Sequence, residues 1–354
     1  MACTSTTEPT DIVISTTAGT FTGTDAAPCV TREQLNSDYG GDLGLAINDV
    51  VKQLAPQGGG TVFVHSGGRM MTPISVLYTP TENVFRVVVD FLGNVVDLAS
   101  PTSSPEDSPS FVRVSGGGQC SVQNAIVRAP EGQTKPIVHF DATFNFQPGD
   151  LNGYCTSHHN RFEGLDILGS GNSFDGVLIE MDHCGRVLNN VFKRVMVEGC
   201  RAVLKFKQHE PRINAQEKVK ETWANYNNFL GIYGRDFVRL VEFEVDEEVE
   251  KPQIVGNFFS GIFGEVGAHT EGGLDGLAGT GNMYHHVWLR PPRSPDVADL
   301  QIPDIVVEPR GIDTYITAHD TRGLEDGGQG TTMLAPVVWR GTDLRRVHRG
   351  DRLP

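Results

Sequence analysis

Acidic side chains gather in one stretch of the chain, and carboxylates perform much of the acid–base and calcium chemistry of proteins. The acids of this stretch are Asp166, Asp175, Glu180, Asp182 and Glu198, with His183 and Arg186 beside them. If they lie on adjacent strands they converge on one face, where they hold Ca²⁺ or act as general acid and base. A solvated acidic face is the simpler interpretation. Asp175, Asp182 and Glu198 are therefore candidate catalytic residues, and we predict no cofactor, with Ca²⁺ as the alternative.

Histidines and cysteines offer a second chemistry, which is metal ligation. The histidines form two adjacent pairs, His158/His159 and His285/His286. Neighbouring residues of a strand point to opposite faces, so neither pair chelates an ion by itself. The six cysteines are Cys3, Cys29, Cys120, Cys155, Cys184 and Cys200, and their spacing is not that of a zinc site. We predict no metal site and assign the cysteines to packing, with a Cys184–Cys200 disulfide as the less favoured alternative.

The elements that position these side chains follow from a pattern of an Asn, any residue, an aromatic ring, two variable residues and an aliphatic residue. Its five copies begin at Asn160, Asn190, Asn227, Asn257 and Asn282. The starts are 30, 37, 30 and 25 residues apart. A unit of this length buries no core alone and must stack on its neighbours. The pattern therefore predicts a solenoid.

Each copy is typical of a strand and a turn, because β-branched and aromatic residues alternate in it and Gly follows. Stacked in register, the copies place two columns inside the coil. These columns are Phe162, Phe192, Phe229, Phe259 and Tyr284, and Leu165, Val195, Ile232, Ile262 and Val287. We expect the Asn column at a turn, because Asn tolerates left-handed backbone and its amide binds the Asn of the next coil.

An amphipathic helix is predicted ahead of the first coil, at about residues 42–54. Its apolar residues recur at helical spacing, and a Pro and a Gly run end it. A strand follows at residues 61–64. We expect the helix to cap the open core.

This order of a helix, the segment GGGTVFV, a Gly-rich turn and coils with Asn and Phe ladders resembles the right-handed parallel β-helix of the pectate-lyase-like superfamily. That superfamily includes pectinases, other polysaccharide lyases and glycosidases, and the tailspikes and related surface proteins of tailed viruses. The resemblance covers about residues 38–290 and implies an all-β solenoid, but no particular reaction. The hydrolase motifs of this fold, Asn-Thr-Asp, Asp-Asp, Gly-His-Gly and Arg-Ile-Lys, are absent from the sequence.

Three segments follow from these patterns. Residues 1–37 form an N-terminal segment, residues 38–290 the β-helix, and residues 291–354 a C-terminal β-rich extension. The extension ends in a basic tail with Arg340, Arg345, Arg346 and Arg349. We expect this tail either to dock on an acidic partner or to be a solvated end.

A row of large side chains is predicted on the outside of the solenoid. The residue after each inward aliphatic points outwards, which gives Asp166 and then Met196, Tyr233, Phe263 and Trp288. An apolar row is not expected to stay bare in water. A subunit interface, cover by another part of the chain and a platform for sugar stacking are the three interpretations, in that order of preference.

Composition excludes two classes of partner. The formal net charge of −15 argues against nucleic acid, and no apolar run is long enough to span a membrane. Scarce Lys and abundant acids suit either a halophilic source or ordinary acidic solubility. The first residues lack the pattern of a signal peptide, so we expect synthesis in a host cytoplasm without Sec-type export.

The favoured function is that of a virion structural or surface protein, such as a tailspike, turret or other capsid projection. We expect it to form a homo-oligomer, as a trimer, to bind other virion proteins and to contribute to host attachment at the virion surface. The alternative is a polysaccharide lyase or glycosidase, including a virion-associated depolymerase, that acts on host surface glycan.

Overall fold

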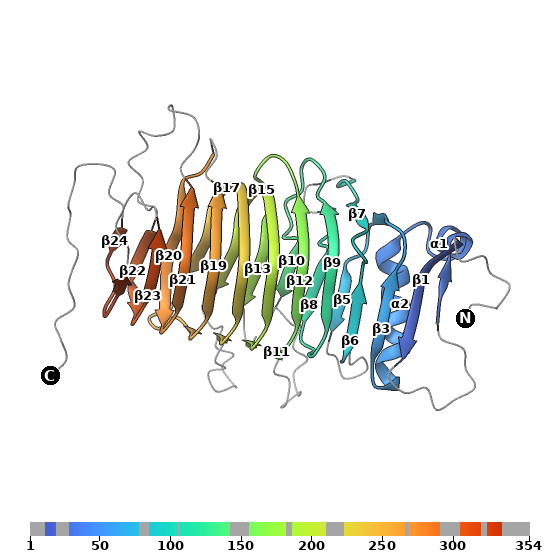
Figure 1. Cartoon of the computed structure of the whole chain (residues 1–354), viewed down its shortest axis with the longest axis horizontal. Helices are drawn as coiled ribbons and strands as arrows, with labels where there is room; N and C mark the ends of the chain where they lie inside the picture. The colour runs from blue at the N-terminus through green and yellow to red at the C-terminus, as the bar shows by residue number, and fades with distance from the viewer. Residues whose placement is uncertain are drawn as a thin grey trace.

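The computed structural model shows an elongated solenoid in which strands stack along one long axis (Figure 1). It describes residues 11–18, 28–77, 85–102, 104, 107–141, 156–181, 186–209, 223–265, 269–290, 305–319 and 324–334. From β3 onward the paired strands run parallel, each with a strand of the next coil. The predicted fold class, an all-β parallel β-helix, is confirmed.

Each complete coil contributes strands to three faces. The corner face consists of β11 (Thr156–His158), β14 (Arg186–Leu188), β16 (Trp223–Asn225) and β18 (Ile254–Val255). The ladder face consists of β9 (Ser121–Arg128), β12 (Arg161–Leu168), the first halves of β15 (Val191–Gln208) and β17 (Asn228–Val245), β19 (Phe258–Glu265), β21 (Met283–Arg290), β23 (Tyr315–His319) and β25 (Thr332–Leu334).

The charged face is the third, and it carries most of the ionised side chains discussed below. It consists of β5 (Ile74–Leu77), β8 (Val112–Ser115), β10 (Val138–Asp141), β13 (Asp175–Met181), the second halves of β15 and β17, β20 (Gly272–Thr280), β22 (Ile305–Ile312) and β24 (Leu324–Asp326). The first coils add β3 (Gly60–Val64), β4 (Gly68–Met70), β6 (Val87–Asp90) and β7 (Val95–Leu98), which lead into β9.

The predicted inward columns are confirmed. The rings of Phe192 and Phe229 stack with centroids 4.8 Å apart, and Phe229 and Phe259 follow at 4.7 Å. Phe162 and Tyr284 continue the stack at either end, and the aliphatic column is buried beside it. Stacked rings and aliphatic side chains fill this part of the interior because the five coils with the repeat present the same residue types at the same register.

The Asn ladder forms as expected, but the left-handed residue is not the Asn itself. The amide oxygen of Asn227 accepts hydrogen bonds from the backbone N–H and the side-chain amide of Asn190, both at 3.0 Å. The positive φ belongs to the preceding residue in each copy, such as Asn189 at 54° and Tyr226 at 56°. The Asn keeps ordinary backbone because its side chain must reach along the axis to the neighbouring coil.

A second left-handed position bends each ladder strand in its middle. It is the residue directly before the aliphatic, with φ 66° at Gly231 and Gly261 and 54° at Arg194. The ladder pairing continues on both sides of this residue. Glycine at this position removes the Cβ clash of left-handed backbone, which explains why three of the five copies carry it.

The N-terminal end of the core is capped by α2 (Leu43–Leu54), as predicted. Its buried face contacts β3, β4 and β5. The carboxylate of Asp42 caps the helix by accepting from the N–H of Gly44, and it also accepts from the N–H groups of Met71 and Thr72. The buried carboxylate therefore joins the helix to the first coil.

Further elements precede α2 in the segment that the sequence left unassigned. They are β1 (Ile12–Ala18), β2 (Val30–Thr31) and α1 (Arg32–Ser37), with the 3₁₀ turn η2 (Ala55–Gln57) after α2. Strand β1 runs antiparallel to both β2 and β3. Over the described part of the chain, no helix is both long and apolar enough to cross a membrane.

Two expectations are corrected by the structure. The ladder does not end at residue 290, because β22 to β25 continue the parallel pairing of β20 and β21. Thr314 takes the ladder Asn position there and is buried. Among the cysteines, Cys120 and Cys200 are buried thiols, as expected, but Cys29 forms a disulfide, so packing alone does not account for it. Cys184 lies outside the described residues.

Candidate functional site

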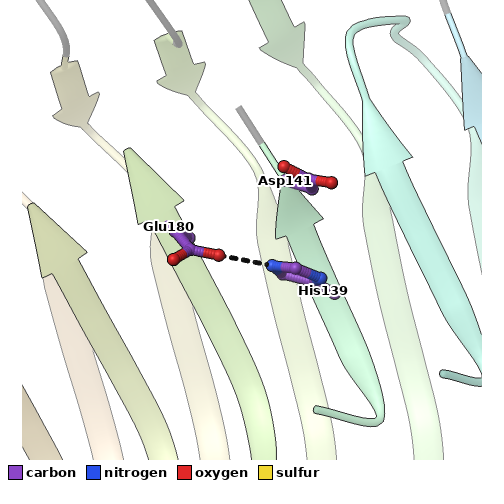
Figure 2. Close-up of side chains that lie close together, drawn as sticks. All are labelled: His139, Asp141 and Glu180. Atoms are coloured by element: carbon purple, nitrogen blue, oxygen red, sulfur yellow. Dashed lines mark hydrogen bonds and ion pairs between the residues drawn. The ribbon is translucent and has the colours of Figure 1, made fainter. Parts of the chain in front are cut away.

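The charged face brings together three polar side chains from two strands that are about 40 residues apart in the sequence. His139 and Asp141 lie two residues apart on β10, so both point away from the core residues Val138 and Phe140. Asp141 pairs in register with Glu180 of β13 on the next coil. Parallel stacking of the two strands therefore places an imidazole and two carboxylates side by side (Figure 2).

The three groups are within reach of one common ligand. Nε2 of His139 donates to Oε2 of Glu180 at 2.9 Å. One ligand atom from each of His139, Asp141 and Glu180 lies within 4.8 Å of the other two. The side chains of His139 and Glu180 are 17% and 19% exposed, so solvent reaches the cluster.

A second histidine supports Glu180 from the following coil. Nε2 of His209 lies 3.0 Å from Oε1 of Glu180, and its Nδ1 lies 3.4 Å from Oδ2 of Asp246. The hydrogen bond from His139 is the main cause that lowers the pKa of Glu180 to about 2, against the opposing effect of burial. Glu180 is thus a fixed anion at neutral pH and does not serve as a general acid.

Arg113 holds the third member of the cluster. Its Nε donates to Oδ2 of Asp141 at 2.9 Å, and its terminal nitrogen contacts the same oxygen. The side chain of Asp141 is only 6% exposed, so the guanidinium compensates a carboxylate that is largely out of water. This arrangement offers carboxylate and imidazole ligands to a cation, and carboxylates that orient an imidazole.

A run of ion pairs continues along the charged face beyond this cluster. Lys205, which is buried, lies 3.2 Å from Glu242, and Lys207 lies 3.2 Å from Glu244. Nε of Arg239 donates to Asp275 at 2.7 Å on the next coils. Opposite charges at neighbouring register positions therefore stabilise this face. Most of its acidic residues are explained as partners in these ion pairs.

Of the catalytic candidates from the sequence, the structure describes Asp175 and Glu198, and these two lie on different faces of the solenoid. Asp175 is buried at the start of β13, where Arg201 donates to its Oδ2 at 2.6 Å and its Oδ1 has no hydrogen-bond partner. Burial raises the pKa of Asp175 despite Arg201. Glu198 lies on the ladder face, 3.8 Å from Arg235. Asp182 lies outside the described residues.

The sequence missed His139, Asp141 and His209 because they stand outside the acidic stretch. The available signal was the alternation of polar and apolar residues along a strand. The segment VHFD has polar residues at its second and fourth positions, and the segment VLIE ends in a polar residue after three aliphatic ones. That signal marks outward residues but does not say which coils lie together. The pairing of β10 with β13 supplies this information.

The outward row has the predicted register. Met196, Tyr233, Phe263 and Trp288 are direct neighbours on successive coils, and Asp166 precedes them. The rings of Tyr233 and Phe263 stack at 5.1 Å and 8°, whereas Phe263 and Trp288 meet edge to face at 6.2 Å. Trp288 is 51% exposed. Arg340, Arg345, Arg346 and Arg349 lie outside the described residues.

A charged column runs beside this row, two residues further along each strand. It consists of Glu198, Arg235 and Glu265. Arg235 lies 3.8 Å from Glu198 and 3.7 Å from Glu265, and the hydroxyl of Tyr233 donates to Glu265 at 2.7 Å. The apolar row therefore has a polar rim of alternating charge.

Comparison with known proteins identifies no family for this chain. No family model matches the chain, and no curated protein matches it. Among solved structures it is similar to an endo-xylogalacturonan hydrolase from Aspergillus tubingensis, with a TM-score of 0.38 and 11% identity over 85% of this chain and 91% of that one. It is also similar to the tailspike protein of Acinetobacter baumannii phage AM24, with a TM-score of 0.25 and 12% identity over 94% of this chain and 60% of that one. The pairing of its own strands makes the chain a parallel β-helix protein.

Proposed function

We propose that the protein is a structural or surface subunit of a virus particle, a tailspike or other capsid projection, that assembles side by side with copies of itself. The expected assembly is a trimer held by the row of Met196, Tyr233, Phe263 and Trp288. The observation that carries this proposal is the orientation of the stacked rings on the ladder face. Its place would be the virion surface, where it would bind other virion proteins and contribute to host attachment.

The ring orientation favours a protein contact over a sugar platform. Sugars stack on the open faces of aromatic rings, but the facing sides of Tyr233 and Phe263 cover each other at 5.1 Å. Stacking along the axis leaves mainly ring edges towards solvent. A strip of edges, with Met196 at one end, suits packing against another apolar surface.

The surroundings of the row also support a second copy as the partner. The adjacent column carries both charges in alternation, with Arg235 between Glu198 and Glu265. Because charges of both signs alternate there, this rim presents no block of one charge that would repel a second copy. The strip spans four coils, about 14 Å at the usual spacing of strands. It is narrow enough that the polar rim excludes water from it.

The test removes the apolar strip without touching the core. Tyr233→Ser combined with Phe263→Ser is expected to convert the oligomer to a monomer, measured as mass by light scattering or sedimentation. The matched control is Tyr226→Ser combined with Met283→Ser, which removes exposed apolar side chains that lie outside the row. An unchanged mass for the row variant, or a wild-type monomer at micromolar concentration, contradicts the proposal.

A second candidate function is cleavage of host surface glycan. The specific observation in its favour is the pair of carboxylates, Asp141 and Glu180, beside His139 on a solvent-reached face. The measurement is release of reducing or unsaturated sugar from the surface glycan of a host. Loss of release in Glu180→Gln places the chemistry in this cluster, and loss in Asp175→Asn with Asp182→Asn places it in the acidic stretch. No release by the wild-type chain leaves the structural function alone.

A further inference from the structure

The cluster of His139, Asp141 and Glu180 connects the side chains of two neighbouring strands, β10 and β13. Its members come from two coils, yet their ligand atoms fall within 4.8 Å of one another. One imidazole and two carboxylates match the ligand set of borderline divalent cations such as Zn²⁺ and Co²⁺. Ca²⁺ prefers six to eight oxygen ligands, and the imidazole makes this site a poor one for it.

We propose that His139, Asp141 and Glu180 form a binding site for a divalent transition cation of the Zn²⁺ class on the charged face, between β10 and β13. This site is independent of the assembly proposed above.

The spacing of the ligand atoms suits such an ion. A tetrahedral Zn²⁺ holds its ligand atoms about 3.4 Å apart when each bond is about 2.0–2.2 Å long. Here Nε2 of His139 and Oε2 of Glu180 are 2.9 Å apart, and no pair exceeds 4.8 Å. A small rotation of Asp141 closes the set. Because the cluster is part-exposed, water completes the coordination, and the cation replaces the proton of Nε2, which passes to solvent.

Glu180 has the outer hydrogen-bond partners that commonly hold a metal ligand in a fixed orientation. His209 holds Oε1 at 3.0 Å while Oε2 faces His139, so the carboxylate is fixed in orientation. Asp246 lies 3.4 Å from the other nitrogen of His209. Carboxylates and histidines that bind metals are commonly oriented by such outer partners, and losing one partner costs roughly 10- to 100-fold in affinity.

Arg113 makes the proposal sharply testable, because it competes with the cation for Asp141. If Asp141 is a ligand, removing the guanidinium strengthens cation binding. If Asp141 serves only as the partner of Arg113, the substitution acts on the cation only through the loss of one nearby positive charge, and binding strengthens less. The two roles of Asp141 thus predict different affinities for one variant.

The experiment is titration of the full, tag-free chain with Zn²⁺ by calorimetry, with Ca²⁺ as the comparison ion. We expect one Zn²⁺ site per chain that is weakened roughly tenfold or more by His139→Ala, Glu180→Gln or His209→Ala. Arg113→Gln is expected to bind more tightly than the wild type. His65→Ala is the control, because His65 is an exposed histidine that contacts Ser15 in the first coil, away from β10.

The outcomes separate without ambiguity. Absence of Zn²⁺ binding by the wild type, or wild-type affinity in both His139→Ala and Glu180→Gln, overturns the proposal. Circular dichroism verifies that each variant is folded. If His139→Ala does not fold, the visible absorption of Co²⁺ bound to the wild type reports nitrogen ligation directly. Co²⁺ bands that Zn²⁺ displaces support the site, and a spectrum of hydrated Co²⁺ alone contradicts it.

Discussion

At the scale of single residues, the Asn ladder shows how one side chain satisfies two coils at once. Asn227 accepts two hydrogen bonds from Asn190, and its own Nδ2 donates to Oδ1 of Asn257 at 2.9 Å and to the carbonyl of Val187 at 3.0 Å. All of these groups are buried. Removing such a side chain leaves donors and acceptors without partners on both neighbouring coils.

Asn227→Ala is therefore expected to lower the free energy of unfolding by about 2–4 kcal/mol. The control is Asn228→Ala at the next position, where the amide contacts only the carbonyl of Tyr226 at 3.3 Å, and the expected cost is below about 0.5 kcal/mol. Urea unfolding followed by circular dichroism measures both. Equal costs for the two substitutions would show that the ladder amides contribute nothing special.

Glu163 gives a prediction for pH. Burial opposes its ionisation, but hydrogen bonds from Arg161, Lys193 and Arg194 prevail and lower the pKa of Glu163 to about 2, from a reference value of 4.5. A group with a lowered pKa in the folded state stabilises the protein above its unfolded pKa. This stabilisation is lost as the pH falls from about 4.5 to about 2.

Glu163→Gln is therefore expected to cost about 1 kcal/mol at pH 7, because the three cations are largely exposed and screened by solvent. The melting temperature of the variant should fall less steeply than that of the wild type between pH 4.5 and pH 2. Melting curves across this range provide the measurement. Parallel pH profiles for the two proteins would exclude this role of Glu163.

At the scale of elements, the bends of the strands depend on glycines that differ in their surroundings. A Cβ on Gly231 meets nothing closer than 3.9 Å, so only its φ of 66° opposes a side chain. A Cβ on Gly199, with φ 68°, would lie 2.3 Å from the carbonyl oxygen of Gly169 on the preceding coil. The same substitution therefore tests backbone strain at one position and coil spacing at the other.

Gly231→Ala is expected to cost about 1–2 kcal/mol, the usual penalty of left-handed backbone for a residue with a Cβ. Gly199→Ala is expected to cost clearly more, because the clash is with backbone that cannot move without separating two coils. Chemical unfolding of both variants gives the comparison. A smaller cost for Gly199→Ala than for Gly231→Ala would contradict the spacing of these coils.

Sequence reasoning predicted the strands of those coils that carry the same residue types at equivalent positions. It missed the strands of coils in which other residue types occupy these positions. The ladder from Asn160 to Asn282 was visible because each coil carries the same residue types at the same positions. The earlier coil carries Cys120 at the ladder Asn position, although its N–H still donates to Oδ1 of Asn160 at 3.1 Å. The amide oxygen of Asn160 accepts from a backbone N–H, and every residue type except Pro has this group. The ladder of hydrogen bonds therefore continues to a coil that lacks the Asn of the sequence pattern.

The candidate site was harder to predict than the fold for a related reason. His139 and Glu180 are 41 positions apart, and they meet because β10 and β13 are consecutive strands of the charged face. Composition drew attention to Asp175 instead, whose carboxylate is buried against Arg201. Local alternation identifies outward residues, but the length of each coil decides which of them become neighbours.

At the scale of the whole molecule, the net charge of −15 is spread over a long thin body. Ion pairs on the charged face compensate part of it, and the remaining acids repel one another. We propose that this acidic balance suits a salt-rich habitat. Salt screens such repulsion, since the Debye length falls from about 10 Å at 0.1 M to about 3 Å at 1 M.

The melting temperature is therefore expected to rise by several degrees between 0.1 M and 2 M KCl. Sodium chloride should act alike, because the effect is one of ionic strength, and sucrose at equal osmolality serves as the uncharged control. A melting temperature that falls in KCl would mean that screening weakens the ion pairs more than it relieves repulsion.

The stacking of coils also determines how the molecule responds to a pull along its axis. Hydrogen bonds between parallel strands point along that axis, so tension loads every inter-coil contact in series and the weakest contact fails first. Pairing between β15 and β17 extends from Val191 to Gln208, whereas β24 and β25 hold the last described coil by three residues each. Rupture should therefore begin at that C-terminal coil and proceed in discrete steps of one coil. The molecule then lengthens by one unfolded coil at each step, while the coils in its middle stay paired.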